Sequence, residues 1–421
     1  MSHLSAHSTW LNVLHRSPLV HLMGSAVHLG LQLLQVMVIG HVLGVDVIGH
    51  YGYCLAIITP VLLLATWHVR HARVVDAAGI FAWQAYARLR TVGLFAAFIL
   101  LASGLLIPGL KEIGPMFASL VILKISDSWM DLPYSAYQRT GEIGRIGIGV
   151  GSRGMLSTMA FIIVLTGPGT LPGAIIVQTV VSWGWWLSVE RPGLRTARVF
   201  GERNDANVSP VSLWWRVWPL GLTVALGSLV ASFPRIALAE RHGAEEAGHF
   251  LLLGYLFIPA LLLQGSLQQS VAPKLAASAH QGKRSEMVRL LLRLAVHQIA
   301  AVLVAMGGVW AVQSLFGLFW VVRGFVISPP ELAWFTGGLI LAVMNNVIGL
   351  AMDAVGFFRG KLGYWLMIAV TCSSLTWWWA DRGIVGVGIA AVVAGVIGVL
   401  VGGWWLARLR LPSEGGPSHG I

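Results

Sequence analysis

Apolar runs separated by short polar breaks follow one another along nearly the whole chain. Each run holds roughly 17 to 25 residues, which is enough to cross a hydrocarbon core of about 30 Å as a helix. The runs lack the alternation of polar and apolar residues that marks a membrane barrel. The pattern predicts twelve helical spans, at residues 19–40, 50–69, 91–108, 113–132, 147–167, 171–189, 213–234, 248–270, 290–313, 332–352, 362–380 and 384–406.

The composition is that of a chain whose main solvent is lipid. Of 421 residues, 56% are hydrophobic and only 11% are charged, and the mean hydropathy is +0.76, far above the average for soluble proteins. We therefore expect an all-α integral membrane protein. The residues before the first span contain no short apolar core with a small-residue cleavage site, so the first span itself is expected to act as the insertion signal.

Lys and Arg are distributed unevenly between the predicted loops. With the N-terminus inside, the inner side receives about 21 of them and the outer side about 5, as expected when cytoplasmic loops retain positive charge. Both termini should then be cytoplasmic, in a multi-pass protein of the inner (cytoplasmic) membrane. The asymmetry also accounts for most of the formal charge of +11, so nucleic acid is not expected as a partner.

The loop and helix after the first predicted span are repeated, without gaps, after the seventh. Gly44, Gly49, His50 and Pro60 fall on Gly243, Gly248, His249 and Pro259, with Asp46 on Glu245 and Tyr51 on Phe250. Six spans separate the copies, so both halves should share one orientation, as in transporters built from parallel repeats around a central cavity. We predict an N-terminal six-helix lobe (1–190), a cytoplasmic linker (191–212), a C-terminal six-helix lobe (213–406) and a cytoplasmic tail (407–421).

Ionisable residues inside the spans are few, and their cost in lipid makes them point toward the protein interior or toward water. Lys124 lies near the middle of the fourth span, and Asp127 and Asp131 follow on the same helix face. One interpretation is a neutralised pair of Lys124 and Asp127 that serves packing. The other is a cation facing the cavity, with an acid beside it that tunes its charge or carries a coupling proton.

Three arginines extend this candidate site. Arg153 lies deep in the fifth span beside three glycines. Because a guanidinium stays ionised and binds phosphate oxygens through paired donors, it suggests an anionic substrate, unless helix carbonyls satisfy it. Arg235 lies near the outer end of the seventh span, and Arg70 marks the inner end of the second, where a purely topogenic charge is an equal interpretation.

The remaining polar residues predict neither a metal site nor an enzyme. His28 and Gln32 share one face of the first span, and they either line the cavity or bond across helices. The 14 histidines lack the paired spacing of a zinc helix, and Cys54 and Cys372 lie far apart. Because the common nucleophile, nucleotide and zinc-protease motifs are absent from the sequence, we expect a transporter that uses no cofactor.

Three stretches carry a resemblance to a known family. They run from Val42 to Pro60, from Ser126 to Gly154 and from Pro234 to Ala276. These stretches resemble the polysaccharide or O-antigen flippases of the Wzx type, in the superfamily that also contains multidrug exporters and lipid II flippases. The histidine-rich first two spans and the segment from Gln264 to Gln269 depart from the family pattern.

The resemblance implies two six-helix bundles, a cationic central cavity and transfer of a polyprenyl (undecaprenyl) diphosphate-linked oligosaccharide from the inner to the outer leaflet. Such transfer serves synthesis of surface polysaccharide, including the O-antigen of lipopolysaccharide. Lys124, Arg153 and Arg235 are the residues that we expect to bind the diphosphate. Expected partners are the lipid-linked glycan, the bilayer and polysaccharide assembly enzymes.

Two alternatives remain open at this stage. A cation-coupled multidrug or metabolite antiporter would favour an acidic cavity, whereas Asp127 is the principal acid within the spans. A membrane glycan polymerase or glycosyltransferase would need a sizeable outer loop, and the longest one expected here runs only from Arg235 to Ala247.

Overall fold

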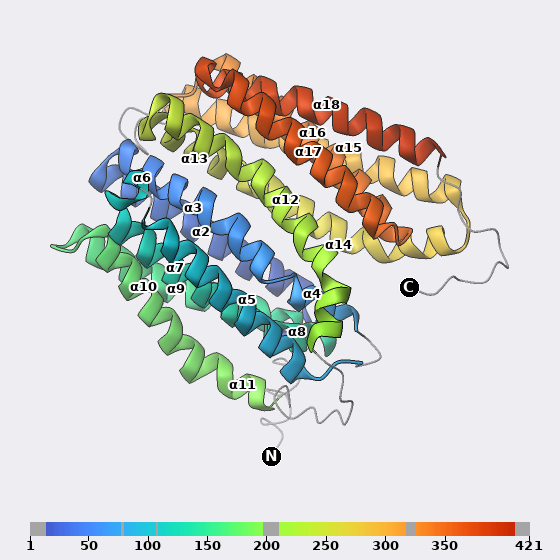
Figure 1. Cartoon of the computed structure of the whole chain (residues 1–421), viewed down its shortest axis with the longest axis horizontal. Coiled ribbons are helices and arrows are strands. Elements are labelled where there is room, and N and C mark those ends of the chain that lie inside the picture. Colours follow the sequence, from blue (N-terminus) through green and yellow to red (C-terminus); the bar gives the residue numbers. More distant parts are fainter. Residues whose placement is uncertain (1–13, 77–79, 107, 197–209, 317–325, 409–421) are drawn as a thin grey trace. The chain divides into compact units, whose positions relative to one another are not determined.

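The chain is helical throughout the part that the structure describes. The computed structural model describes residues 14–76, 80–106, 108–196, 210–316 and 326–408, and these ranges contain no strand. Eight helical segments within them are long and apolar enough to cross a membrane, and the bent pair Ala244–Leu256 and Ile258–His280 raises the number to nine. Each of the twelve predicted spans falls on a helix or on this pair (Figure 1). The predicted fold class, an all-α multi-pass membrane protein, is confirmed.

The helices are divided between two compact units. Met1–Leu43 and Ile57–Ala225 form the first unit, and Gly44–Ala56 and Leu226–Ile421 form the second. Two helices, α3 (Val45–Ala65) and α12 (Pro210–His242), therefore contribute to both.

The first unit combines long helices with several short ones. Its other elements are α2 (Pro18–Leu43), α4 (Val69–Val75), α5 (Trp83–Gly104), α6 (Pro108–Lys111), α7 (Gly114–Asp131), α8 (Tyr134–Arg139), α9 (Ile143–Thr166), α10 (Leu171–Trp185), the π-helix η1 (Trp186–Glu190) and α11 (Arg191–Thr196). The last three follow one another as a nearly continuous helix (Figure 1). The remainder of the predicted linker up to residue 209, and the tail from residue 409, lie outside the described residues.

The second unit holds the remaining long helices. They are α13 (Ala244–Leu256), α14 (Ile258–His280), α15 (Arg284–Phe316), α16 (Pro329–Ala354), α17 (Phe358–Trp379), the 3-10 turn η3 (Ala380–Arg382) and α18 (Gly383–Arg408). In this unit α16 and α18 lie side by side (Figure 1). Helix α18 alone has 26 residues, about 39 Å at 1.5 Å per residue, so it can cross a bilayer.

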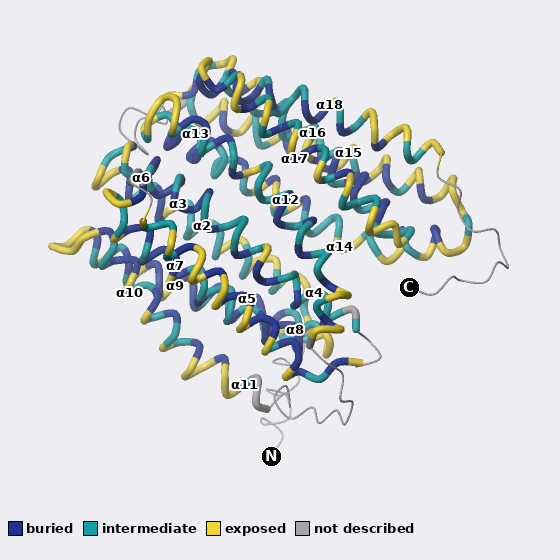
Figure 2. The backbone as a smooth tube through the Cα atoms, viewed as in Figure 1, coloured by how far each residue is buried: buried dark blue, intermediate teal, exposed yellow. Residues whose placement is uncertain are grey.

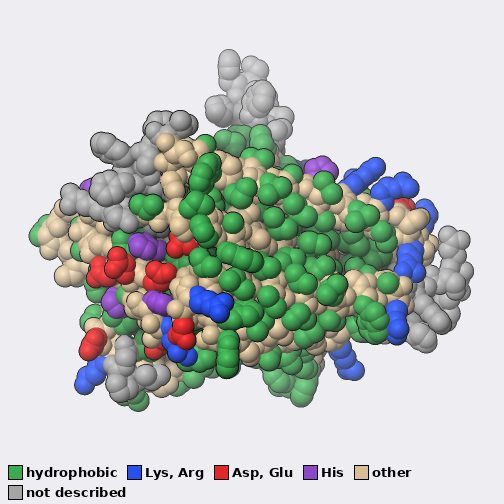
Figure 3. Space-filling model, turned by 90° about the horizontal axis from the view of Figure 1, so that it is seen from above, with side chains coloured by type: hydrophobic (Ala, Val, Ile, Leu, Met, Phe, Trp, Pro, Cys, Tyr) green, Lys and Arg blue, Asp and Glu red, His purple; other side chains and the backbone are tan. Residues whose placement is uncertain are grey.

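The outward faces of the long helices are apolar, as lipid contact requires. On α5 the side chains of Val92, Phe95 and Ile99 are 66%, 64% and 54% exposed, and on α15 Val304 is 75% exposed. Figure 2 shows exposed positions recurring along helices such as α18. Hydrophobic side chains cover the broad middle of the face in Figure 3, and charged ones gather toward its ends. A contiguous apolar surface of this extent belongs in lipid rather than water.

Close packing of α2 on α9 explains the glycines beside Arg153. A Cβ atom at Gly147 would lie 2.5 Å from the Cα of His21, and one at Gly154 would lie 2.7 Å from Nδ1 of His28. Small residues at such crossings let helix backbones approach closely in lipid. Helix α2 therefore occupies the room beside Arg153 that the sequence leaves free.

The internal repeat appears in the structure as matching glycine positions. Gly44 and Gly243, which are equivalent, both adopt positive φ, 101° and 89°, immediately before α3 and α13. The equivalent Gly49 and Gly248 pack reciprocally in the second unit. A Cβ at Gly49 would meet the carbonyl oxygen of Ala244 at 1.6 Å, and one at Gly248 would meet that of Val45 at 2.5 Å. The start of each repeat thus fits against the other only because both positions are glycine.

Asp76 ties down the chain between α4 and α5. Its Oδ1 accepts from the amide of Ile80 at 3.1 Å, and its Oδ2 accepts from the amide of Phe81 at 3.2 Å and from the hydroxyl of Tyr86 at 2.8 Å. Burial alone would raise the pKa of Asp76, but these hydrogen bonds and the charge of Arg139 bring the pKa below its usual value.

We expect the substitution Asp76→Asn to destabilise the first unit by about 2 kcal/mol at neutral pH, since hydrogen bonds to an ionised group are replaced by weaker ones. A carboxyl with a depressed folded-state pKa contributes stability above its unfolded-state pKa of about 3.9, and loses it as the pH falls through the folded-state value. The difference in melting temperature from wild type should therefore hold from pH 8 to pH 5 and close below about pH 4. A difference that grew as the pH fell would contradict this role.

Candidate functional site

The site begins at a break between α3 and α4 in the first unit. Trp67 and His68 both adopt positive φ, 48° and 51°, which is unusual for residues with bulky side chains. Packing holds the break in place: a Cβ at Gly93 of α5 would lie 1.9 Å from the carbonyl oxygen of Ala65, and one at Gly221 of α12 would lie 2.7 Å from the Cα of Trp67. Strained backbone of this kind persists where the surrounding structure over-determines it, often at functional sites.

Arg70 follows the break directly and pairs with Asp131 at the end of α7. Its Nε also donates to Oε1 of Gln138 at 3.2 Å, and its guanidinium lies 5.6 Å from the ring centre of Tyr134. The other oxygen of Asp131 is 3.8 Å from Nη2 of Arg90, whose side chain is only 4% exposed. One carboxylate is therefore shared by two guanidinium groups.

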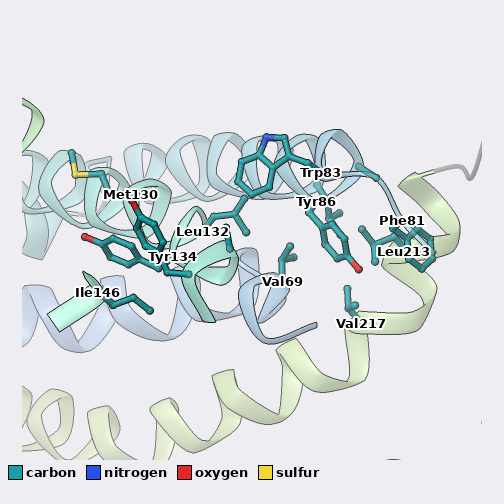
Figure 4. Close-up of a cluster of buried hydrophobic side chains, with 14 of the residues drawn as sticks. Val69, Phe81, Trp83, Tyr86, Met130, Leu132, Tyr134, Ile146, Leu213 and Val217 are labelled. Atoms are coloured by element: carbon teal, nitrogen blue, oxygen red, sulfur yellow. The ribbon is translucent and has the colours of Figure 1, made fainter. Parts of the chain in front are cut away.

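Arg153 of α9 is the most enclosed of the predicted site residues. Its Nη1 lies 3.9 Å from Oε2 of Glu190 and donates to the sulfur of Met130 at 3.1 Å. The same carboxylate oxygen accepts from the hydroxyl of Tyr134 at 2.5 Å, and the Arg153 and Glu190 side chains are 9% and 4% exposed. Figure 4 shows Met130 and Tyr134 at one end of a cluster of buried apolar side chains in the first unit. Tyr134 therefore contacts both Arg70 and Arg153.

Lys124 and His28 complete the cluster on neighbouring helices. Nζ of Lys124 is 3.6 Å from Oδ2 of Asp127, and the two side chains are 27% and 38% exposed. His28 and Gln32 are joined through their side chains at 3.1 Å. The imidazole of His28 also interacts electrostatically with Asp127, Lys124 and Arg153. Helices α2, α7 and α9 thus bring the predicted cations and polar residues of the first unit together.

Arg235 belongs to the second unit. It lies inside α12, which continues to His242, rather than at the end of that helix. Its Nη2 donates to Oγ of Ser232 at 3.3 Å, and it interacts electrostatically with Tyr255. A shared role of Arg235 with the cations of the first unit stays a prediction.

Four functional candidates were missed by the sequence interpretation: Glu190, Tyr134, Arg90 and Arg73. In the sequence, Glu190 lies between a predicted span and a polar stretch, a position typical of a linker residue. In the structure it ends a π-helix and is buried. Arg73 is 1% exposed, donates to Oγ of Ser135 at 2.7 Å and lies 4.7 Å from the ring centre of Trp83. Local π-helical turns are frequent at functional sites, but the sequence does not mark this one.

The electrostatic balance of the cluster is positive. Four cations, Arg70, Arg90, Lys124 and Arg153, face three carboxylates, Asp127, Asp131 and Glu190. Lys124 lies ten residues after the start of α7, or about 15 Å along the helix, so the charge reaches toward the middle of the bilayer. The arrangement can hold an anion such as phosphate, because guanidinium groups offer paired donors to its oxygens.

Comparisons with known proteins establish the fold. No protein-family model matches the chain. The structure of the lipid II flippase MurJ, in an inward closed conformation, covers 93% of this chain and 88% of its own with a TM-score of 0.67 at 13% identity. A MATE transporter from Vibrio cholerae covers 96% and 98% with a TM-score of 0.66 at 14% identity. An outward-facing MATE multidrug resistance transporter of the MOP superfamily covers 94% of both chains with a TM-score of 0.64 at 12% identity.

A sequence relative points in the same direction. The capsular polysaccharide biosynthesis protein CapF of Staphylococcus aureus is 22% identical over 254 residues, which are 59% of this chain and 62% of that protein. The chain is thus a multi-pass membrane protein with the fold shared by MATE transporters and MurJ. The predicted fold resemblance is confirmed.

Proposed function

We propose that the protein is a flippase that moves a polyprenyl diphosphate-linked oligosaccharide from the inner to the outer leaflet for surface polysaccharide synthesis. The proposal rests on the positive cluster in the first unit. The side chains of Arg153 and Arg90 are buried in the protein, and those of Lys124 and Arg70 are partly exposed. Buried cations are costly in lipid and are expected where an anion is bound. A diphosphate is such an anion.

The comparisons support this choice of substrate class. MurJ is described as a lipid II flippase, and CapF as a capsular polysaccharide biosynthesis protein. Both descriptions concern glycans of the cell surface. We propose for this chain a cargo that combines the two, a lipid-linked glycan, and we propose that it acts as a transporter rather than as an enzyme.

The ion pairs suggest how the site binds and releases its cargo. Asp131 and Glu190 hold Arg70 and Arg153 in place when no substrate is bound, and the phosphate oxygens then compete with these carboxylates for the same donors. Each guanidinium exchanges one anionic partner for another, so neither cation is unpaired before or after transfer, whereas each displaced carboxylate loses its cation. This cost favours release of the cargo, because the carboxylates then regain their cations.

We propose an inner-membrane location with cytoplasmic termini. In the second unit, Arg284 donates to the carbonyl oxygens at the end of α18, where Arg408 also lies. The start of α18 instead contacts Glu246 through the amide of Ile384 at 3.1 Å. The end of α18 is therefore basic, whereas its start brings together acidic and basic residues such as Asp381 and Arg241. An excess of basic residues at one end is the distribution that the positive-inside rule expects.

A cation-coupled multidrug antiporter is the second candidate. It is favoured by the MATE likenesses and by the partly exposed Asp127 and Asp131. A drug cation would have to displace resident cations in a cluster that already holds four cations and three carboxylates. The lipid-linked glycan therefore fits the electrostatics better.

The test is to deplete the protein and measure which leaflet holds lipid-linked oligosaccharide. We expect completed units to accumulate on the cytoplasmic face, because export is blocked after assembly. Wild type and the control Lys111→Gln, a change in the exposed short helix α6, should restore export. Lys124→Gln should restore it at least about tenfold less well, the factor for a loss of ~1.4 kcal/mol of interaction. Unchanged lipid-linked sugars together with drug sensitivity would support the antiporter, and unpolymerised units on the outer face would support a polymerase.

A further inference from the structure

The glutamines of α14 mark a polar stretch on a face that is otherwise apolar. Val271, Leu275 and Ala279 of this helix pack in a cluster with α15 and α16. Gln264 and Gln268 lie at positions that continue the same face toward the start of the helix. Gln264 is buried and Gln268 partly buried. The core face of α14 therefore changes from apolar to amide-bearing along its length.

This stretch lies just after a bend in the membrane helix. Helices α13 and α14 meet at an angle of 49° at Phe257. In the first unit, the repeat-equivalent helix α3 is followed by the break at Trp67 and His68, after which Arg70 enters the cation cluster. Interrupted helices in both repeats are a pointer to substrate sites in transporters. In the register of the repeat, Gln264 and Gln268 align with Ala65 and Val69, the residues that flank the break at Trp67 and His68.

The amides at this place have unused hydrogen-bonding capacity. Gln298 of α15 is 1% exposed, and its Nε2 donates to the carbonyl oxygen of Gln264 at 3.3 Å. Within the described residues, its buried Oε1 accepts no hydrogen bond, and the buried Nε2 of Gln268 donates none. Buried polar atoms without a partner are rare and call for an explanation such as a ligand. One open acceptor and one open donor match a hydroxyl group, which can both donate and accept.

The helix segments that carry the amides are uncharged. The sequence contains no Asp, Glu, Lys or Arg from Ile258 to Pro273, and none from Leu294 to Phe316. His297 in the latter segment is bound to the carbonyl oxygen of Arg293 on its own helix. The place therefore suits a neutral polar group rather than a phosphate, in contrast to the cation cluster of the first unit.

We infer that Gln264, Gln268 and Gln298 form a subsite in the second unit that binds the neutral sugar portion of the cargo through its hydroxyl or acetamido groups. The inference rests on the proposed function and deepens it. The amide subsite makes binding of the cargo depend on its glycan. Discrimination by buried amides is strong, because a ligand that lacks the hydroxyl leaves them unpaired.

The experiment compares two probes on the purified full-length protein in nanodiscs. One is undecaprenyl diphosphate, and the other is undecaprenyl diphosphate carrying the completed oligosaccharide extracted from depleted cells. We expect wild type to bind the glycan-bearing probe at least about tenfold more tightly, corresponding to ~1.4 kcal/mol. The variants Gln268→Met and Gln298→Met, which are similar in shape but cannot form the hydrogen bonds, should reduce this ratio to about twofold or less while leaving the affinity for the bare lipid unchanged.

The matched control is Gln178→Met in the first unit, because Gln178 and Gln35 already satisfy each other through two hydrogen bonds of 3.1 Å. It should keep the wild-type ratio. Melting temperature and size-exclusion profile identify any variant that fails to fold, and the milder Gln268→Asn then replaces it. Equal loss of affinity for both probes, an unchanged ratio in the variants, or equal affinity of wild type for both probes would overturn the glycan subsite alone. Wild type that binds neither probe would overturn the proposed function as well.

Discussion

Replacing Arg153 by Gln should abolish transport and also destabilise the protein. The guanidinium is expected to bind the diphosphate, so its loss should reduce lipid-linked oligosaccharide transfer in proteoliposomes to background. The same change leaves Glu190 buried, with a side chain only 4% exposed and without its cation. Removing one partner of a buried ion pair costs on the order of 3–5 kcal/mol, which a fall in melting temperature should report.

A second variant separates these two effects. In Arg153→Gln with Glu190→Gln both charges are gone, so most of the lost stability should return, whereas transport should stay at background because no guanidinium remains. The matched control is Arg145→Gln on the same helix, whose pair with Glu142 is about 30% exposed and should contribute little. If the double variant regained both stability and transport, Arg153 would be a structural residue, and the proposed site would lose its main member.

The substitution Gly49→Val should prevent formation of the second unit. Its Cβ would lie 1.6 Å from the carbonyl oxygen of Ala244, a distance that no side-chain adjustment can relieve because the obstacle is backbone. The starts of α3 and α13 would have to separate, and the reciprocal fit of Gly248 on Val45 would be lost with them. We expect membrane abundance to fall at least about tenfold, since overpacking against rigid backbone costs well over 1 kcal/mol.

The chain supplies a matched control for this prediction in Gly254. It lies in α13, the helix against which Gly49 packs, and a Cβ there would meet no atom within 4 Å. The substitution Gly254→Ala should leave abundance unchanged or slightly raised, because alanine favours the helix. Abundance can be compared by quantitative immunoblot of membrane fractions. Equal abundance of Gly49→Val and wild type would mean that the two helix starts do not pack as described.

Several of the ion pairs could not have been assigned in advance. The sequence is equally consistent with Arg70 as a topogenic charge and as a binding residue. In the structure Arg70 follows the break at Trp67 and His68 and pairs with Asp131. Positive φ at a tryptophan and a histidine has no local sequence signal, because it is enforced by Gly93 and Gly221 on other helices. Glu190 likewise has no local signal, because the sequence shows only a polar residue at the end of a span. In the structure it lies at the end of a π-helix, beside Arg153.

By itself, the sequence determined the features that depend on local composition and spacing. Long apolar runs specify membrane helices wherever they occur, and the glycines of the repeat, Gly44 and Gly243, specify where each repeat begins, because positive φ favours glycine. Only the tertiary structure decided which charge meets which, and that α2 fills the space beside Arg153. Such contacts join residues far apart in the chain, and their energy depends on distance and burial, which no local pattern records.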